Sequence, residues 1–157
     1  MEYIEKKVCG AYNFDKYFSY IKTIKNNLPK NVFTFASNWK YYSLESHSSL
    51  HDSWLERLSI EEKNKRDEQD RTANITVLLL GAYHDRLISL EYLDVHYYLI
   101  EGILLDTRGH GDILIHEIRL NKKNLIEHEV LFSDNTKFLI SCSNIIHKEI
   151  SLKGNTL

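Results

Sequence analysis

Residues 73–101 read ANITVLLLGAYHDRLISLEYLDVHYYLIE and form the longest apolar and aromatic run in the chain. The apolar block at residues 75–80 ends at Gly81, and a short unbroken block predicts a central strand buried on both faces. Residues 87–92 then alternate between apolar and polar side chains, which predicts a half-buried strand. Two consecutive strands joined by a short turn favour an antiparallel pair.

Before this run, the pattern of apolar residues is helical. Aromatic and aliphatic residues recur at spacings of three and four between residues 14 and 28, which predicts an amphipathic helix with Asn13 or Asp15 near its cap. Pro29 should end this helix, because the residue before a proline is pushed out of helical geometry. A second, shorter helix is expected at about residues 31–38.

After the helices, the chain consists mostly of short alternating segments. We expect further strands at residues 53–60, 112–120, 125–132, 137–142 and 147–152. The highly charged residues 61–71 and the glycine-containing residues 105–112 are predicted to be loops, and residues 133–136 a hairpin turn.

These elements predict an α+β fold in a single domain spanning residues 1–157. Its helical part covers about residues 13–38 and its strand-rich part about residues 50–152. N-terminal helices would pack on a mainly antiparallel sheet of roughly six to eight strands, since the short connections leave no room for crossover helices.

Composition limits the class of protein. A chain of 157 residues can bury a core without disulfides or metal, and it has no run of eighteen apolar residues that would span a membrane. Its first ten residues mix acidic and basic side chains and lack a signal-peptide core, so we expect a cytoplasmic protein. Cys9 and Cys142 form no CxxC motif, and reduced, buried thiols are the favoured interpretation over a disulfide.

Charge is distributed unevenly along the chain. Residues 1–40 carry a net charge of +4, whereas residues 41–157 carry −6. An acidic strand-rich part disfavours nucleic-acid binding, because phosphate contacts need a basic surface. It suits a basic protein partner through complementary potentials, although solubility alone explains it equally well.

Two His-Asp dipeptides are the main candidates for chemistry: His51-Asp52 and His84-Asp85. Together with nearby carboxylates and imidazoles they could form a metal site or an acid-base pair, as in a small metal-dependent hydrolase or nuclease. Their spacing matches no HExxH, CxxC or DxDxDG signature, so we expect no bound metal or cofactor. A structural role in turns is favoured for both pairs.

Other residues with reactive or aromatic side chains are interpreted as core. His116 and His128 share their parity with apolar residues in consecutive strands, which is typical of hydrogen-bonded core histidines. Cys142 also lies on an apolar parity, where a thiol is inert. The aromatic cluster Trp39, Tyr41 and Tyr42 is predicted to pack beneath the sheet, with a ligand-stacking role as the alternative.

The order of segments resembles that of a group of bacterial proteins. The matching segments are LPK, FASNWKYYSL, SLHDSWLERL, VLLLGAYHDRLISLEY, HEIRL, IEHEVLFSDNTKFLIS and CSNI, over about residues 14–150. This layout is similar to small bacterial proteins with a Leu-His-Asp segment, here residues 50–52, before an antiparallel sheet. Some of them resemble immunity proteins encoded beside polymorphic or contact-dependent growth-inhibition toxins. The resemblance implies a cytoplasmic, non-catalytic protein that binds and blocks a toxin domain, often a nuclease.

Partner contacts are expected from acidic residues around the two predicted loops and from two adjacent tyrosines, which are enriched at interfaces. The expected contact residues are Glu56, Glu61, Glu62, Asp67, Glu68, Asp70, Tyr97, Tyr98, Asp106 and Asp112.

Overall fold

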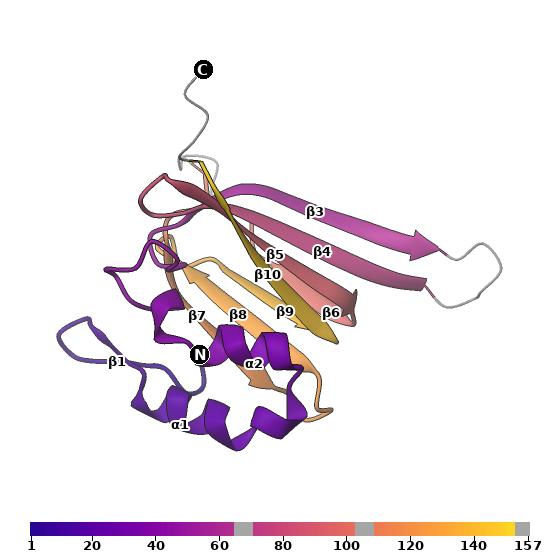
Figure 1. The fold of residues 1–157 in the computed structure, drawn as a ribbon, viewed down its shortest axis with the longest axis horizontal. Helices are drawn as coiled ribbons and strands as arrows, with labels where there is room; N and C mark the ends of the chain where they lie inside the picture. The colour runs from indigo at the N-terminus through magenta and orange to yellow at the C-terminus, as the bar shows by residue number, and fades with distance from the viewer. Residues whose placement is uncertain (65–70, 103–108, 153–157) are drawn as a thin grey trace.

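The fold is an arrangement of antiparallel strands with two short helices near the N-terminus (Figure 1). It was determined as a computed structural model that describes residues 1–64, 71–102 and 109–152. The described residues form ten strands in three antiparallel sheets, which confirms a mostly-β version of the α+β class. The predicted six to eight strands were too few, since the chain also forms a two-residue strand pair near its N-terminus and a separate strand after His96.

The two α-helices lie within the predicted range, but the helical part is more divided and a 3-10 turn extends it to Tyr41. The single helix expected at residues 14–28 ends early, and a 3-10 turn containing two asparagines, which are weak helix formers, precedes Pro29. Asn13 accepts a hydrogen bond from the backbone N–H of Asp15 at 2.9 Å, while Phe14 occupies the cap position. The helical elements are α1 (Asp15–Thr23), η1 (Lys25–Asn27), α2 (Lys30–Ser37) and η2 (Trp39–Tyr41).

Two strands extend into a segment that the sequence predicted to be a loop. β3 continues to Asn64 and β4 begins at Arg71, because the backbone pairing with β4 continues past the core to Asn64. The strands are β1 (Glu5–Lys6), β2 (Tyr12–Asn13), β3 (Trp54–Asn64), β4 (Arg71–Leu80), β5 (Arg86–Val95), β6 (Tyr97–Ile100), β7 (Ile113–Leu120), β8 (Ile126–Phe132), β9 (Lys137–Cys142) and β10 (Asn144–Ser151).

The two larger sheets are connected where a strand of one is followed directly by a strand of the other. One sheet has the order β10-β5-β4-β3 and the other β6-β9-β8-β7. The chain passes from the first sheet to the second at His96, between β5 and β6, and from the second back to the first at Ser143, between β9 and β10. The backbone groups of Asp52 and Ser53 bond to Ile113 at 2.8 and 3.1 Å, so the starts of β3 and β7 are also joined.

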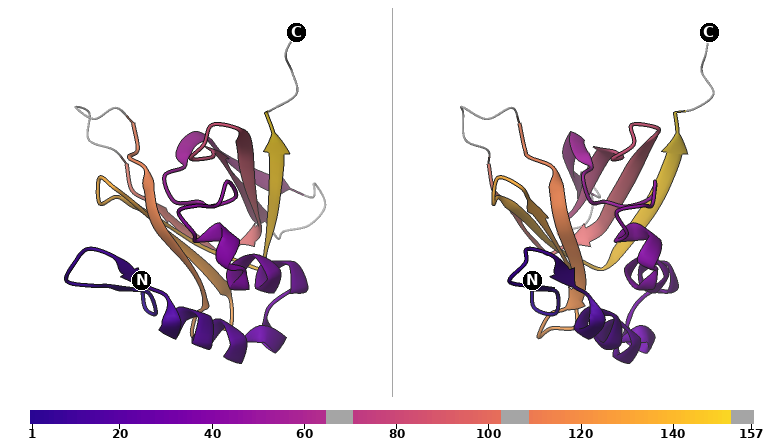
Figure 2. Two further views of the ribbon diagram at one scale, coloured as in Figure 1. Left: turned by 60° about the vertical axis from the view of Figure 1, so that its left-hand side comes forward. Right: turned by 90° about the vertical axis from the view of Figure 1, so that its left-hand side faces the viewer.

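The apolar face of each sheet points toward the other sheet and toward the helices (Figure 2). Buried residues from α1, α2 and both sheets form one continuous cluster. α2 lies along β10, where the Asn31 amide donates to the carbonyl of Ile145 at 2.7 Å. The helices therefore cover edges that the strands leave unpaired.

The predicted central strand is buried on one face only. In β4, Ile75, Val77 and Leu79 are buried, whereas Leu78 and Leu80 are partly exposed on the outer face. The expectation of burial on both faces was wrong because, among the described residues, no layer packs on the outside of this sheet.

A short N-terminal segment is fixed by a buried carboxylate on the outer side of the second sheet. Glu117 is fully buried and accepts hydrogen bonds of 2.9 Å from the backbone N–H groups of Glu2, Tyr3 and Ile4. Arg119 lies 3.3 Å from the same carboxylate. A charged acceptor thus satisfies three donors that have no strand partner.

The two cysteines differ in environment. Cys142 is buried, as predicted, and burial raises the pKa of its thiol to about 12. Cys9 is exposed beside Gly10 in the turn between β1 and β2, so the expectation that both thiols are buried was wrong.

The longest helix in the described part of the chain is α1, with nine residues. A membrane-spanning helix needs about 20 residues, and none of the described helices meets the length and hydropathy required.

Candidate functional site

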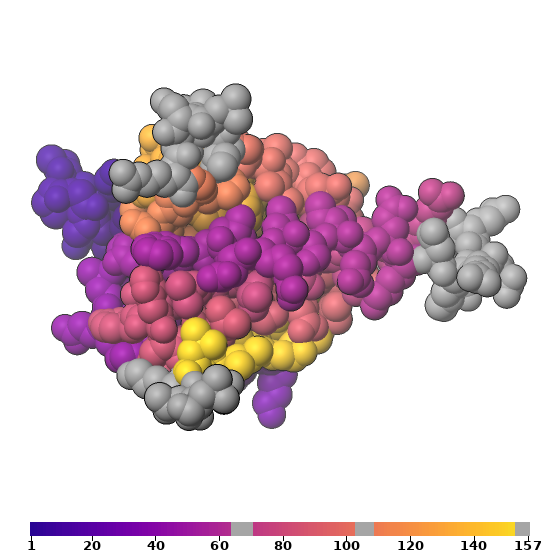
Figure 3. Space-filling view, turned by 90° about the horizontal axis from the view of Figure 1, so that it is seen from above, coloured from indigo at the N-terminus to yellow at the C-terminus, as the bar shows by residue number. Residues whose placement is uncertain are grey.

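The outer face of the β10-β5-β4-β3 sheet carries an apolar row that crosses all four strands. The register aligns Trp54 with Leu80, Leu80 with Leu87, and Leu87 with Ile150. Trp54 is 48% exposed and Ile150 is 53% exposed, at the two ends of the row. Figure 3 looks onto this face, with β3 running across the middle and β10 in yellow below it. Soluble proteins rarely expose a continuous apolar patch on their surface. Where they do, the patch generally marks a contact site.

Trp54 reaches the outer face because β3 contains a bulge. Leu55 pairs with Leu79 and Arg57 with Leu78, so Glu56 is an extra residue and the side chains change faces around it. Trp54 and Leu58 have the same parity in the sequence, but the bulge places them on opposite faces of the sheet. The indole Nε1 of Trp54 donates to Asp112 Oδ1 at 2.6 Å, which fixes the ring at the surface.

Carboxylates follow β3 along the edge of the sheet. The predicted contact residues Glu56, Glu61 and Glu62 are all exposed on this strand, together with Arg57 and Lys63. Asp52 and Asp112, both exposed, flank the start of the strand. Carboxylates therefore outnumber cationic groups along this edge.

The structure places the predicted contact residues along β3 rather than at one point. Asp112 lies beside Trp54, whereas Glu62 lies eight residues further, roughly 26 Å away at 3.3 Å per residue. Glu62 pairs with Ala73, which pairs with Val95, two residues before Tyr97. Tyr97 and Tyr98 are 53% and 45% exposed on β6. The remaining predicted residues, Asp67, Glu68, Asp70 and Asp106, lie outside the described residues.

The two His-Asp dipeptides form their close contacts with different partners. His51 Nδ1 lies 2.9 Å from Asp52 Oδ1 of its own pair, while the His84 ring packs edge-on against Trp54 with centroids 4.4 Å apart. Asp52 and His84 both have positive φ, at 60° and 52°, a conformation that Asp and His adopt more readily than most residues. Within residues 1–64, 71–102 and 109–152, no group of three His, Cys, Asp or Glu side chains could hold a metal ion.

Asp85 instead joins a network that connects three segments. Its carboxylate contacts His47 Nδ1 at 2.8 Å and Arg86 Nε at 3.2 Å, and Arg86 also bonds Glu149 at 2.5 Å. The hydrogen bond from Arg86 lowers the pKa of Asp85 to about 2. Ser48 donates to the same Glu149 carboxylate at 2.9 Å. The network links the loop before β3, the β4–β5 turn and β10.

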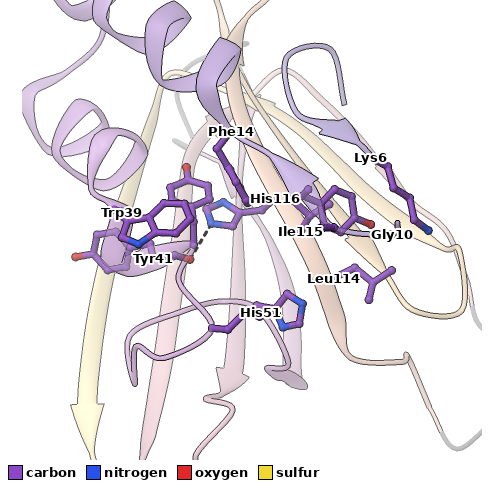
Figure 4. A pocket seen from close by; sticks show the side chains of 13 residues that line it. Lys6, Gly10, Phe14, Trp39, Tyr41, His51, Leu114, Ile115 and His116 are labelled. Atoms are coloured by element: carbon purple, nitrogen blue, oxygen red, sulfur yellow. Dashed lines mark hydrogen bonds between the residues drawn. The ribbon is translucent and has the colours of Figure 1, made fainter. Parts of the chain in front are cut away.

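A second feature is a pocket of about 450 Å³ between the β1–β2 hairpin, η2 and the start of β7 (Figure 4). Its walls are largely aromatic and aliphatic, with Lys6 and His51 at its edges. Tyr41 and Tyr42 are buried as predicted, but Trp39 is 52% exposed and lines the pocket. The aromatic cluster thus contributes to both the core and the surface.

The pocket floor contains the start of a buried chain of hydrogen bonds. His116 Nε2 lies 3.3 Å from the Tyr41 carbonyl, and its Nδ1 lies 3.1 Å from His128 Nε2. His128 Nδ1 is 2.7 Å from the Tyr92 hydroxyl. A carbonyl only accepts, so His116 Nε2 must donate, and in neutral rings the direction of every other bond follows: Tyr92 donates to His128, and His128 donates to His116.

Burial keeps these imidazoles neutral. It lowers the pKa of His116 to about 3 and that of His128 well below its usual range. His147, whose ring stacks on Phe35 with centroids 4.7 Å apart, has its pKa lowered by burial to about 4. The prediction that His116 and His128 are core histidines is confirmed.

Several residues of these two features were not singled out from the sequence. Trp54 and Ile150 look like core residues until the bulge and the register place them on the outer face. Lys6, Tyr12 and Phe14 are brought together with η2 only by the packing of the N-terminal hairpin. The one available signal was the strong clustering of aromatic residues between positions 12 and 42.

Comparison with known proteins gives no match: no family model, no curated protein and no solved structure is similar to this chain.

Proposed function

We propose that this protein is a cytoplasmic, non-catalytic binding protein that holds a basic protein partner on the outer face of its β10-β5-β4-β3 sheet. The observation that carries this proposal is the apolar row from Trp54 to Ile150, bordered by the carboxylates of β3. Interfaces commonly combine an aromatic centre with a charged rim.

The apolar row supplies the part of the interface that loses water. Trp54 is held in place by Asp112, so little side-chain freedom is lost when a partner covers it. Tryptophan is enriched among residues that dominate binding energy. Leu80 and Leu87 extend the apolar contact between the two exposed ends of the row.

The carboxylates along β3 contribute selectivity for a basic partner and increase the rate of association with it. Glu56, Glu61 and Glu62 present negative charge without a buried counterion, and rim charges of this kind mainly increase the association rate. Lys148 on the same sheet is neutralised by Glu91 at 2.6 Å, so it opposes a basic partner only weakly. A partner with lysines or arginines around an apolar patch fits this face.

The sequence resemblance gives the proposal its concrete form. We take the partner to be a bacterial toxin domain, of which a nuclease is one example, and the protein to be its immunity protein. Nuclease domains bind phosphate through basic surfaces, which is the charge that the β3 edge complements.

The test begins with capture of the partner by the tagged chain from cells that encode it, followed by identification and purification. Association is then measured at several salt concentrations for the wild type, for the double variant Glu61→Lys/Glu62→Lys and for Ile150→Asp. We expect the charge reversal to slow association at least tenfold at low salt. Ile150→Asp should speed dissociation, because it places a charge in the apolar row.

Glu45→Lys is the matched control, since Glu45 is an exposed carboxylate in the loop before β3. It should leave both rates near those of the wild type. If the face variants bind as the wild type does, this face is not the interface. If the partner binds here but its expression does not harm cells, the face is correct and the toxin assignment is wrong.

A further inference from the structure

The aromatic pocket has a chemistry of its own, independent of the proposed partner face. It is lined mainly by ring and aliphatic side chains from four separate segments, and Figure 4 shows Phe14 at its top and Trp39 at its left. The lining residues used below are Lys6, Phe14, Trp39, His51, Leu114 and His116. A pocket of about 450 Å³ has the size of known small-ligand sites.

The buried imidazole of His116 on the pocket floor offers a ligand no hydrogen bond. His116 appears polar, but both of its ring nitrogens are used, by Tyr41 and by His128. One face of its ring is covered by Tyr42 at 4.3 Å with an interplanar angle of 9°. The part of a ligand that enters most deeply must therefore be apolar, since a polar group there would lose water without a partner.

The walls favour a flat ring. Phe14 and Trp39 meet edge to face with centroids 5.2 Å apart, and Trp39, which lines the pocket, is 52% exposed. Exposed tryptophan in a pocket provides a large rigid surface on which an aromatic ring stacks at little entropic cost.

Charged side chains are present only at the edges of the pocket, and the two edges differ in the sign of their charge. Lys6 lies opposite Tyr12 in the β1–β2 hairpin, and both line the pocket. Lys6 forms no ion pair with any residue of the described chain, whereas His51 at the other edge lies against the Asp52 carboxylate. An anionic group is thus attracted toward Lys6 and repelled from the side of Asp52.

We propose that this pocket binds a small planar aromatic carboxylate, with its ring against Trp39 and Phe14 and its carboxylate at Lys6. The ring fills the apolar interior and the carboxylate remains at the hydrated rim. The site requires no metal or covalent step, and it does not depend on the partner-binding proposal.

Indole-3-acetate is a suitable probe, and indole-3-acetamide has the same ring without the charge. Binding of each is measured by isothermal titration calorimetry to the wild type, Lys6→Gln, Trp39→Ala and the control Lys7→Gln. Lys7 is an exposed neighbour in the same hairpin that does not line the pocket.

We expect the acetate to bind more tightly than the acetamide. Lys6→Gln should weaken the acetate about threefold to fivefold and leave the acetamide unchanged. Trp39→Ala should weaken both probes at least tenfold, and Lys7→Gln should weaken neither.

Three results would overturn the proposal. Equal binding of the two probes would show that the pocket does not select a carboxylate. Binding of both probes to Trp39→Ala with wild-type affinity would place their site elsewhere. No binding of either probe to a wild type whose melting temperature shows it folded would show that the pocket does not take this class of ligand.

Discussion

The two strands β3 and β7 begin side by side, but they differ in whether their outer edge is covered by other parts of the chain. At β7, the hydroxyls of Tyr17 and Tyr20 on α1 accept hydrogen bonds from backbone N–H groups. The donors are Ile118, at 3.3 Å from Tyr17, and Leu120, at 2.9 Å from Tyr20. Side chains from a helix thus replace the missing neighbouring strand. The outer edge of β7 is therefore covered by α1.

At β3, the same kind of edge is left open. β4 is the only strand that pairs with β3 in the described chain. The exposed side chains of residues 54–63 are three carboxylates, two cationic groups, Trp54 and Ile60. Charged side chains on an edge strand prevent aggregation, yet they leave the edge available to a partner of opposite charge. Buried polar groups here fix the fold, whereas exposed ones define a surface.

The largest effect expected of a single substitution distinguishes the two kinds of carboxylate. Glu117→Gln removes the buried negative charge and one of the two oxygens that accept from the backbone N–H groups of Glu2, Tyr3 and Ile4, so it should lower the free energy of unfolding by about 3 kcal/mol. Glu61→Gln on β3 should change it by less than about 0.5 kcal/mol. Urea denaturation of both variants measures the difference, and similar losses would mean that the buried carboxylate is not a structural anchor.

Acid should destabilise the histidine-containing core. The folded pKa values of His116, His128 and His147 lie below the unfolded value of 6.5, so the unfolded chain binds more protons in acid. Stability is therefore fully present above pH 6.5 and falls as the pH drops toward the folded values. The loss should be up to about 1.4 kcal/mol per pH unit for each histidine.

Denaturation at pH 7.5 and at about pH 5 measures this slope. His147→Phe, which keeps a ring against Phe35, should reduce it. A free energy of unfolding that stays constant over this range would contradict the neutral state of the buried rings.

The smallest effect concerns single hydroxyls. Tyr17 accepts from Ile118 and contacts the Tyr42 hydroxyl at 2.7 Å, and Tyr42 in turn donates to the Ala36 carbonyl. Tyr17→Phe leaves the Ile118 N–H without its acceptor and should cost about 1–3 kcal/mol. Tyr98→Phe on the exposed β6 should shift the melting temperature hardly at all. Equal shifts would show that the β7 edge does not need its tyrosine cover.

The order and type of the elements could be predicted from the sequence wherever the hydrophobic periodicity matched the burial found in the structure. Patterns of neighbouring residues were sufficient in four cases: the helices around Pro29, the pair β4–β5, the turn after Phe132 and the buried His128. Segments in which charge and backbone pairing disagreed were predicted less well. The ends of β3 and β4 are strands despite their charge, because their hydrogen bonds come from each other's backbone.

The sites depended on information that no local pattern contains. One extra residue at Glu56 moves Trp54 to the outer face, and the register then aligns it with Ile150, almost one hundred residues away in the sequence. The pocket likewise combines Lys6 with Trp39 and His116 through packing alone.

An antiparallel α+β fold, its helical start, two core histidines and an acidic strand-rich part could all be predicted from the sequence alone. These properties depend on residues close together in the chain or on totals over many residues. Only the tertiary structure decided which apolar residues remain outside, which carboxylate is buried and which histidine closes a pocket floor. The physical reason is that burial of a side chain depends on the layers around it, and distant segments supply those layers.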